Sequence, residues 1–117
     1  ISAALSYSGQ RSLILIQYTG LLYSMNAIRA VAVEYQMPIC LMVGLLGKEP
    51  GVLPTESKRY GVRIIEPILD AMGVITFRVD KAEELEGGMS AAINTAFKGG
   101  CASALILGQS FLGAKAF

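Results

Sequence analysis

The chain has 117 residues, of which 53% are hydrophobic and 16% charged, and its ten basic and nine acidic residues leave a net charge of +1. This length allows one compact core and excludes two ordinary domains, so we predict a single domain over residues 1–117. The scattered charges form no basic stripe, which argues against nucleic acid as a partner. A hydrophobic share this high favours burial against another chain, and we expect a homo- or hetero-oligomer.

No segment has the pattern of a membrane span or of a secretion signal. The uncharged segment Thr19–Ile28 is too short to cross a bilayer, and the N-terminus lacks a basic start with an apolar stretch and a cleavage site. Cys40 and Cys101 both lie in apolar strand-like runs, where a buried, reduced thiol is the ordinary state. These features predict a cytoplasmic protein that does not bind a membrane.

The residue types exclude several kinds of catalytic site. The chain has no histidine and two cysteines far apart in sequence, which removes the usual zinc sites and the Ser-His or Cys-His nucleophile systems. Glu83, Glu84 and Glu86 resemble a group of catalytic carboxylates. They fall in the first turns of an amphipathic helix, where acidic side chains suit the helix dipole. We interpret them as a solvated helix start and predict no metal site in this chain.

The first third of the chain alternates between helical and strand-like patterns. A small-residue helix over Ile1–Ser8 has no start signal, which suggests that an N-terminal part of the fold is missing. Continuous aliphatic runs at Leu13–Ile16 and Ile39–Val43 are typical of strands buried on both faces of a parallel sheet. Between them, Leu22–Tyr35 predicts a helix that is apolar all round. Such a helix packs against its own sheet and a second domain or subunit, or lies inside one larger domain.

The segment Gln17–Asn26 joins the first strand to this helix, with Gly20 at the predicted turn. Parallel α/β sheets bind ligands outside the carboxyl ends of their strands, so a ligand site is expected at this corner. One glycine at such a turn names no ligand, and the G-x-G-x-x-G pattern is not present.

A long loop over Gly44–Ser57 follows the second strand, and it is too rich in glycine and proline for regular structure. Its place after the carboxyl end of a strand favours a functional loop over a disordered one. The sequence leaves two interpretations of Lys48 in this loop: it binds an anionic group of a substrate, or it is simply solvated.

The next segments predict a short helix and an edge strand. Glu66–Met72 forms the helix, with Pro67 in its first turn, where proline is tolerated, and Lys58–Arg63 before it stays ambiguous. Val74–Val79 alternates apolar and polar residues, which is typical of a strand at a sheet edge.

The last third of the chain predicts one more helix and a fourth strand. Asp80 and Glu83 form a capping-box-like pair before a helix with apolar residues at every fourth position, and Ala102–Leu107 is the strand. Gly108–Phe117 shows no strong pattern. Repeated units with apolar strands predict an α/β fold with three layers, in which a doubly wound, mostly parallel sheet has helices on both faces.

These motifs resemble the pyrimidine-binding (PYR) domain of thiamine-diphosphate-dependent decarboxylases, in particular the alpha subunit of the sulfopyruvate and phosphonopyruvate decarboxylase group. The family carries Q-N-S-G-L-G-N-S-x-N-A after a strand, and residues 17–27 read Q-Y-T-G-L-L-Y-S-M-N-A. The family's R-G-E-P-G after the next strand corresponds to G-K-E-P-G at residues 47–51. The likeness covers nearly the whole chain, as roughly the C-terminal two thirds of a PYR-like domain.

The resemblance implies one half of a shared site for thiamine diphosphate. A diphosphate-binding partner subunit or domain would hold most of the cofactor together with Mg²⁺, and the substrate would be a small anionic 2-oxo acid. Matching positions assign cofactor contacts to Thr19, Gly20, Leu21, Leu22 and Asn26, and substrate contacts to Lys48 and Arg59.

The chain departs from the family at several positions. The family's second glycine and the asparagine after it are Leu22 and Tyr23 here, and Thr55 and Glu56 replace a glutamine and a histidine. The family's activating glutamate would lie upstream of Ile1, so we predict no catalytic residue in this chain.

These departures leave several functions open. The first is a subunit that decarboxylates 3-sulfopyruvate or phosphonopyruvate with its partner. The second is a PYR domain of another thiamine-diphosphate-dependent decarboxylase or carboligase. The third is a noncatalytic, partner-binding PYR-like domain, and an unrelated α/β domain is the remaining alternative.

Overall fold

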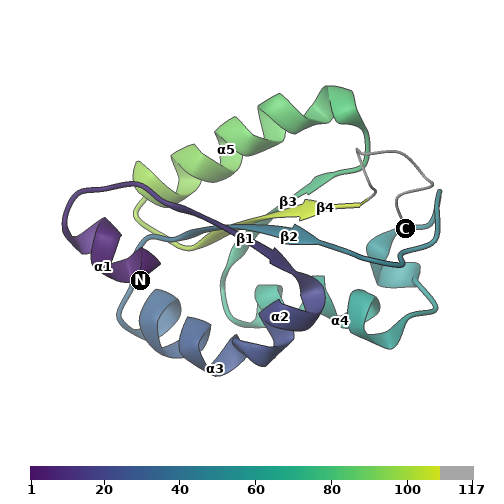
Figure 1. Cartoon of the computed structure of the whole chain (residues 1–117), viewed down its shortest axis with the longest axis horizontal. Helices are drawn as coiled ribbons and strands as arrows, with labels where there is room; N and C mark the ends of the chain where they lie inside the picture. Colours follow the sequence, from purple (N-terminus) through teal and green to yellow (C-terminus); the bar gives the residue numbers. More distant parts are fainter. Residues whose placement is uncertain (109–117) are drawn as a thin grey trace.

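Four parallel strands form the central sheet of the protein, which the computed structural model describes over residues 1–108 (Figure 1). Their order in the sheet is β1-β2-β4-β3, and all three neighbouring pairs are parallel. This arrangement confirms the predicted parallel sheet, and it confirms that the third strand lies at an edge. The strands are β1 (Leu13–Gln17), β2 (Cys40–Gly44), β3 (Ile75–Val79) and β4 (Ser103–Leu107), within one or two residues of the predicted bounds.

Helices connect the strands and lie on both faces of the sheet (Figure 1). The first helix, α1 (Ser2–Tyr7), precedes β1, as predicted. The elements between β1 and β2 are α2 (Tyr18–Tyr23), α3 (Met25–Ala27) and the π-helix η1 (Ile28–Glu34). The others are η2 (Pro54–Glu56) and α4 (Tyr60–Ala71) before β3, and η3 (Ala82–Glu84) and α5 (Leu85–Phe97) before β4.

Two groups of buried side chains fill the space between the sheet and its helices. The larger lies under α2, η1 and α4, where Leu21 and Ile65 pack with Ile106 of the sheet. The smaller lies under α5, where Ala96 packs with Leu105 on the opposite face. Because helices cover both faces, the predicted three-layer, doubly wound α/β architecture is confirmed.

The helix after β1 begins earlier than the sequence pattern indicates. It starts at Tyr18, directly after the extended residue Gln17, so the predicted turn at Gly20 is wrong and this glycine lies inside α2. A Cβ atom on Gly20 would lie 2.9 Å from Cγ1 of Ile16. The glycine therefore serves close packing of α2 on β1 rather than a change of chain direction.

The predicted continuous helix Leu22–Tyr35 is divided into α2, α3 and η1. Ser24 interrupts the helical backbone, and its hydroxyl donates to the carbonyl of Gly20 at 2.8 Å. Such a bond from a serine side chain competes with the regular helical pattern. The seven residues of η1 then adopt a π-helix, which is uncommon and often occurs at functional sites.

The same segment is buried on one side only within this chain. Ile28 and Ala32 are buried against the sheet, whereas Tyr23 is 95% exposed and Tyr35 is 75% exposed. The predicted burial of its second side against another domain or subunit stays a prediction.

The helix α4 begins six residues before the predicted start at Glu66, and Pro67 lies in its interior instead of its first turn. An interior proline removes one helical hydrogen bond. The stripe of Val62, Ile65 and Leu69, all fully buried, recurs at helical spacing and binds the helix to the sheet. This burial outweighs the local cost of the proline.

A bidentate ion pair ties α4 to the edge strand β3. The Arg78 guanidinium donates from Nε to Oε1 of Glu66 at 3.0 Å and from Nη2 to Oε2 at 2.5 Å. Glu66 is almost fully buried, with 8% of its surface exposed. The pairing satisfies a carboxylate that burial would otherwise destabilise.

Three smaller predictions are corrected. The capping box of Asp80 and Glu83 does not form, because residues 82–84 make a 3₁₀ turn and no side chain caps α5. The loop Gly44–Ser57 contains the end of β2 and the short helix η2. Cys40 is buried in β2 as predicted, but Cys101 is half-buried and lies before β4.

The predicted unpatterned tail falls on residues 109–117, which lie outside the described residues. Within residues 1–108, no helix combines the length and the apolar character needed to cross a membrane.

Candidate functional site

The carboxyl ends of the four strands meet at one edge of the sheet. In the register of the three pairs, Gln17 lies beside Gly44, Gly44 beside Leu107, and Leu107 beside Val79. The corner after β1 and the long loop after β2 therefore begin side by side. This is the edge at which parallel α/β sheets bind ligands.

Gln17 connects these two segments directly. Its side chain lies over the bare Cα of Gly44, where a Cβ atom would fall 2.7 Å from Nε2 of Gln17. The backbone N–H of Leu46 donates to Oε1 of Gln17 at 3.3 Å. Gln17 was not among the predicted site residues, although it is the first residue of the motif at residues 17–27 and a glycine ends the neighbouring strand.

Arg59, one of the two predicted substrate residues, is held by the same loop. Its Nε donates to the carbonyl of Gly47 at 2.7 Å. Gly47 has a positive φ of 85°, and a Cβ atom there would collide with the guanidinium. Arg59 is exposed, and its two terminal nitrogens make no hydrogen bond within residues 1–108. No local sequence pattern indicates that Gly47 accommodates Arg59.

Lys48, the other predicted substrate residue, is partly used inside the loop. Its Nζ donates to the carbonyls of Glu49 at 2.9 Å and Val52 at 2.5 Å. An ammonium group has three donors, so one remains for a ligand. Lys48 thus braces the loop and is less available to a substrate than Arg59.

A carboxylate lies close to these cations. Oε1 of Glu49 accepts from the hydroxyl of Ser57 at 3.0 Å, and Oε2 accepts from the backbone N–H of Lys58 at 3.2 Å. Desolvation raises the pKa of Glu49, but these hydrogen bonds and the charge of Arg59 together outweigh it and lower the pKa. The negative charge therefore persists beside Arg59 and limits how strongly this edge attracts an anion.

The predicted cofactor residues of α2 differ in their exposure. Leu21 has no exposed surface and packs in the core, and Gly20 rests on Ile16. These two residues support the corner from beneath, and neither presents a side chain to a ligand.

The other predicted cofactor residues lie nearer the surface. Thr19 is exposed and Leu22 is half-buried. Asn26 is exposed, but its Oδ1 accepts hydrogen bonds from Nε and Nη2 of Arg29 at 3.1 and 2.9 Å. Of this set, Thr19 is the residue with an exposed polar side chain and no side-chain hydrogen bond within the described residues.

A second contact joins the corner to α4. A Cβ atom on Gly61 would lie 2.6 Å from Cε2 of Tyr18, so the tyrosine ring packs on this glycine at the start of α4. The first turns of α2 and α4 are therefore neighbours. The structure brings Thr19 and Arg59, from two predicted groups, to the same end of the sheet.

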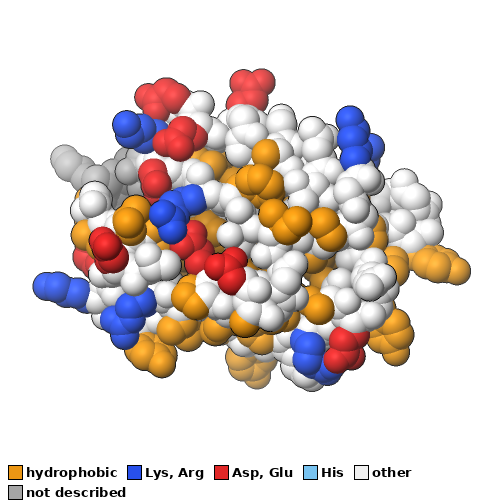
Figure 2. Space-filling view, turned by 180° about the vertical axis from the view of Figure 1, so that it is seen from behind, with side chains coloured by type: hydrophobic (Ala, Val, Ile, Leu, Met, Phe, Trp, Pro, Cys, Tyr) orange, Lys and Arg blue, Asp and Glu red, His pale blue; other side chains and the backbone are white. Residues whose placement is uncertain are grey.

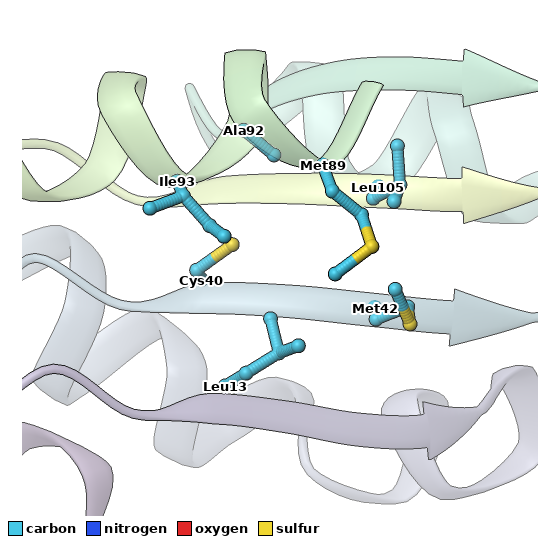
Figure 3. A pocket seen from close by; sticks show the side chains of 7 residues that line it. All are labelled: Leu13, Cys40, Met42, Met89, Ala92, Ile93 and Leu105. Atoms are coloured by element: carbon cyan, nitrogen blue, oxygen red, sulfur yellow. The ribbon is translucent and has the colours of Figure 1, made fainter. Parts of the chain in front are cut away.

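A shallow hollow of about 290 Å³ opens at this edge, lined by Leu15, Ile16, Gln17, Met42, Gly44 and Leu107. Its volume is at the lower end for small-molecule sites. Further along the sheet, side chains of α5 point toward β1, β2 and β4 (Figure 3), and they fill the space so completely that no water fits. Of these two regions of the sheet, the hollow at the carboxyl edge is the one with room for part of a ligand.

The described residues contain no cluster of three or more His, Cys, Asp or Glu side chains that would hold a metal ion. Acidic and basic side chains are interspersed with hydrophobic ones on the face shown in Figure 2. The surface charge is therefore mixed on this face, and the candidate site depends on individual residues.

The comparisons with known proteins do not assign this chain to a family. No protein-family model matches the chain. A search of curated proteins also finds no match. The resemblance to PYR domains stays a prediction that rests on the motifs at residues 17–27 and 47–51.

Proposed function

We propose that this chain is the PYR-type part of a thiamine-diphosphate-dependent 2-oxo acid decarboxylase that acts on 3-sulfopyruvate or phosphonopyruvate. The observation that carries the proposal is the union of its two motifs at the carboxyl edge of the sheet. Gln17 of the first motif lies on Gly44 and Leu46, and Gly47 of the second motif holds Arg59. The two motifs, 30 residues apart in sequence, thus lie at the same edge of the sheet, which supports a shared site.

The residues of this edge fit the neutral part of the cofactor and not its charged part. The Thr19 hydroxyl and the exposed part of Leu22 would contact the pyrimidine ring, while Leu21 and Gly20 support the corner. No metal-binding cluster occurs among the described residues, so a partner subunit or domain would hold Mg²⁺ and the diphosphate. When bound, thiamine diphosphate would accept the electron pair that is released as carbon dioxide leaves.

Arg59 is suited to bind the anionic end of the substrate. Its Nε bond to Gly47 fixes the guanidinium plane, and its two terminal nitrogens remain available. A guanidinium forms paired, charge-assisted hydrogen bonds with the oxygens of a sulfonate or phosphonate. Lys48 would add its one remaining donor. The Glu49 carboxylate would repel anions that are large enough to reach it, and so reduce their binding.

The exposed side of α2 and η1 supports the need for a partner. Tyr23, Val31 and Tyr35 are large apolar residues that stay exposed in this chain, at 95%, 36% and 75% of their surface. Exposed aromatic side chains are enriched at protein interfaces. We propose that this side packs on the diphosphate-binding subunit or domain.

The test measures carbon dioxide release by the chain assembled with its diphosphate-binding partner, in the presence of thiamine diphosphate and Mg²⁺. We expect turnover of 3-sulfopyruvate or phosphonopyruvate, and an increase of about ten-fold in KM for Arg59→Met because a charge-assisted bond is lost. Arg11→Met is the matched control, since Arg11 lies over Phe97 at the opposite end of the sheet. If carbon dioxide is released only from other 2-oxo acids, the result would favour a different decarboxylase or carboligase.

The burial of Leu21 and the engagement of Asn26 with Arg29 favour a second candidate, a noncatalytic partner-binding domain. On this alternative the assembled complex forms but releases no carbon dioxide from any 2-oxo acid. The same experiment therefore separates the two functions.

A further inference from the structure

A short series of contacts runs from the end of β1 to the guanidinium of Arg59. Gln17 accepts a hydrogen bond from the N–H of Leu46, and the next residue, Gly47, accepts one from Nε of Arg59. Gly44 and Gly47 both lack the Cβ atoms that would block these side chains. The N–H that binds Gln17 belongs to the peptide between Leu45 and Leu46, and the carbonyl that holds Arg59 belongs to the peptide between Gly47 and Lys48. A hydrogen bond from the N–H of Lys48 to the carbonyl of Leu45 at 3.0 Å closes the turn that joins these two peptides.

We propose that Gln17 is a positioning residue for substrate binding, which acts through the turn at residues 45–48 to fix the orientation of Arg59. This inference rests on the proposed function, in which Arg59 binds the anionic end of the substrate. Gln17 has no hydrogen bond to Arg59 and acts on it only through the loop.

The remaining contacts of the loop explain why Gln17 is needed. The side chains of Lys48 and Glu49 form their hydrogen bonds within residues 48–58, and the backbone N–H of Lys48 donates to the carbonyl of Leu45 at 3.0 Å. These bonds stiffen the loop without joining it to β1. The bond from Leu46 to Gln17 spans 29 residues and connects the loop to the sheet. Without this acceptor the turn at residues 45–48 is no longer tied to β1, and the Gly47 carbonyl that orients Arg59 shifts with the turn.

The test compares Gln17→Met, which keeps the length of the side chain but removes the acceptor, with Gln17→Glu, which keeps an oxygen for the Leu46 N–H. We expect Gln17→Met to raise KM for 3-sulfopyruvate about five-fold, the effect of one hydrogen bond, and to leave kcat nearly unchanged. Gln17→Glu should recover most of this loss. Gln10→Met, in the turn before β1, is the matched control and should behave like the wild type.

A second readout does not depend on the reaction. In ¹⁵N NMR spectra of the 117-residue chain, we expect the Nε–H of Arg59 to exchange with solvent several-fold faster in Gln17→Met than in the wild type or Gln17→Glu. Unchanged exchange would overturn the inference. So would a loss of kcat without a change in KM, since a positioning residue acts on substrate binding here.

The two measurements also separate failure of the inference from failure of the proposed function. If the assembled wild type decarboxylates no sulfonate or phosphonate substrate, the proposed function is wrong, and the inferred role in substrate binding is overturned with it. If the wild type is active but Gln17→Met changes neither KM nor the exchange of Arg59, only the inference is wrong.

Discussion

The two faces of the sheet differ in how completely they are covered. On the face under α2, η1 and α4, Ile14 and Ile16 of β1 pack against the large core. On the face under α5, the alternate residues of the same strand are open, with Leu13 37% exposed and Leu15 69% exposed. One strand thus has a buried side and an exposed side, although all four residues are aliphatic.

The position of α5 explains this difference. Its side chains pack on β2, β3 and β4, and Leu13 is at the margin of this contact (Figure 3). β1 is also the outer strand of the described sheet, with a neighbour on one side only. Burial of an aliphatic strand therefore depends on where the helices lie, and its sequence alone does not tell which face is covered.

The largest expected contrast compares one buried residue with one exposed residue. Ile65→Ala under α4 should lower the free energy of unfolding by about 3 kcal/mol. The Ile65 side chain has no exposed surface, so its truncation leaves a cavity in the core. Leu15→Ala should change it by less than about 1 kcal/mol, since most of this side chain is already in solvent. Urea denaturation monitored by circular dichroism measures both changes.

If the two substitutions lower the free energy of unfolding equally, the expected difference between the buried and the exposed residue is wrong. Such a result would mean that Leu15 is covered in solution, for example by self-association. Repeating the measurement over a range of protein concentrations distinguishes the two cases, because only association makes stability depend on concentration.

A smaller contrast lies within α5. A Cβ atom on Gly88 would fall 2.6 Å from Cγ2 of Val79, whereas nothing lies within 4 Å of one on Gly87. We expect Gly87→Ala to stabilise the protein by about 0.5–1 kcal/mol through helix propensity. Gly88→Ala should destabilise it by about 1 kcal/mol, because overpacking against the sheet exceeds the same gain.

Thermal denaturation measures the stability of the two variants, and their difference tests how closely α5 packs on the sheet. Stabilisation by both substitutions would show that α5 moves away from Val79 without cost. In that case the α5 face would be loosely packed as well as incompletely covered.

The fold was largely predictable because the strands are continuous apolar segments or, in β3, an alternating one, and each connection contains a helical pattern. The errors occur where packing overrides local signals. Pro67 indicated a helix start, but the stripe from Val62 to Leu69 extends the helix through it. Gly20 indicated a turn, but its contact with Ile16 shows that it serves helix packing.

The candidate site was predictable only at the level of segments. The motifs correctly indicated that residues 17–26 and the loop after β2 belong to the same edge of the sheet. The contacts of Gln17 with Gly44 and of Arg59 with Gly47 depend on missing Cβ atoms across long sequence separations. No local pattern encodes which side chain will occupy the space beside a glycine.

The smallest perturbation is chemical modification of Cys40, the cysteine on the α5 face of the sheet. Cys40 lies under α5 and is 1% exposed, and burial raises the pKa of its thiol, an effect that the neighbouring Ser103 hydroxyl only partly offsets. Cys101 is half-buried and lies outside the sheet. Because the thiolate is the reactive form, a raised pKa leaves less of it at pH 8. We expect iodoacetamide to modify Cys101 at least about ten-fold faster than Cys40.

Mass spectrometry of the two labelled peptides over time measures these rates, and Cys40→Ser and Cys101→Ser assign them. The rate at Cys40 should rise with pH beyond the point at which an ordinary thiol is fully ionised. A comparable rate for the two cysteines at pH 8 would mean that α5 opens readily, because burial could not then protect the thiol. In that case the two faces of the sheet would differ in local stability. The large core under α4 contains no thiol, so Ile65→Ala reports on that face separately.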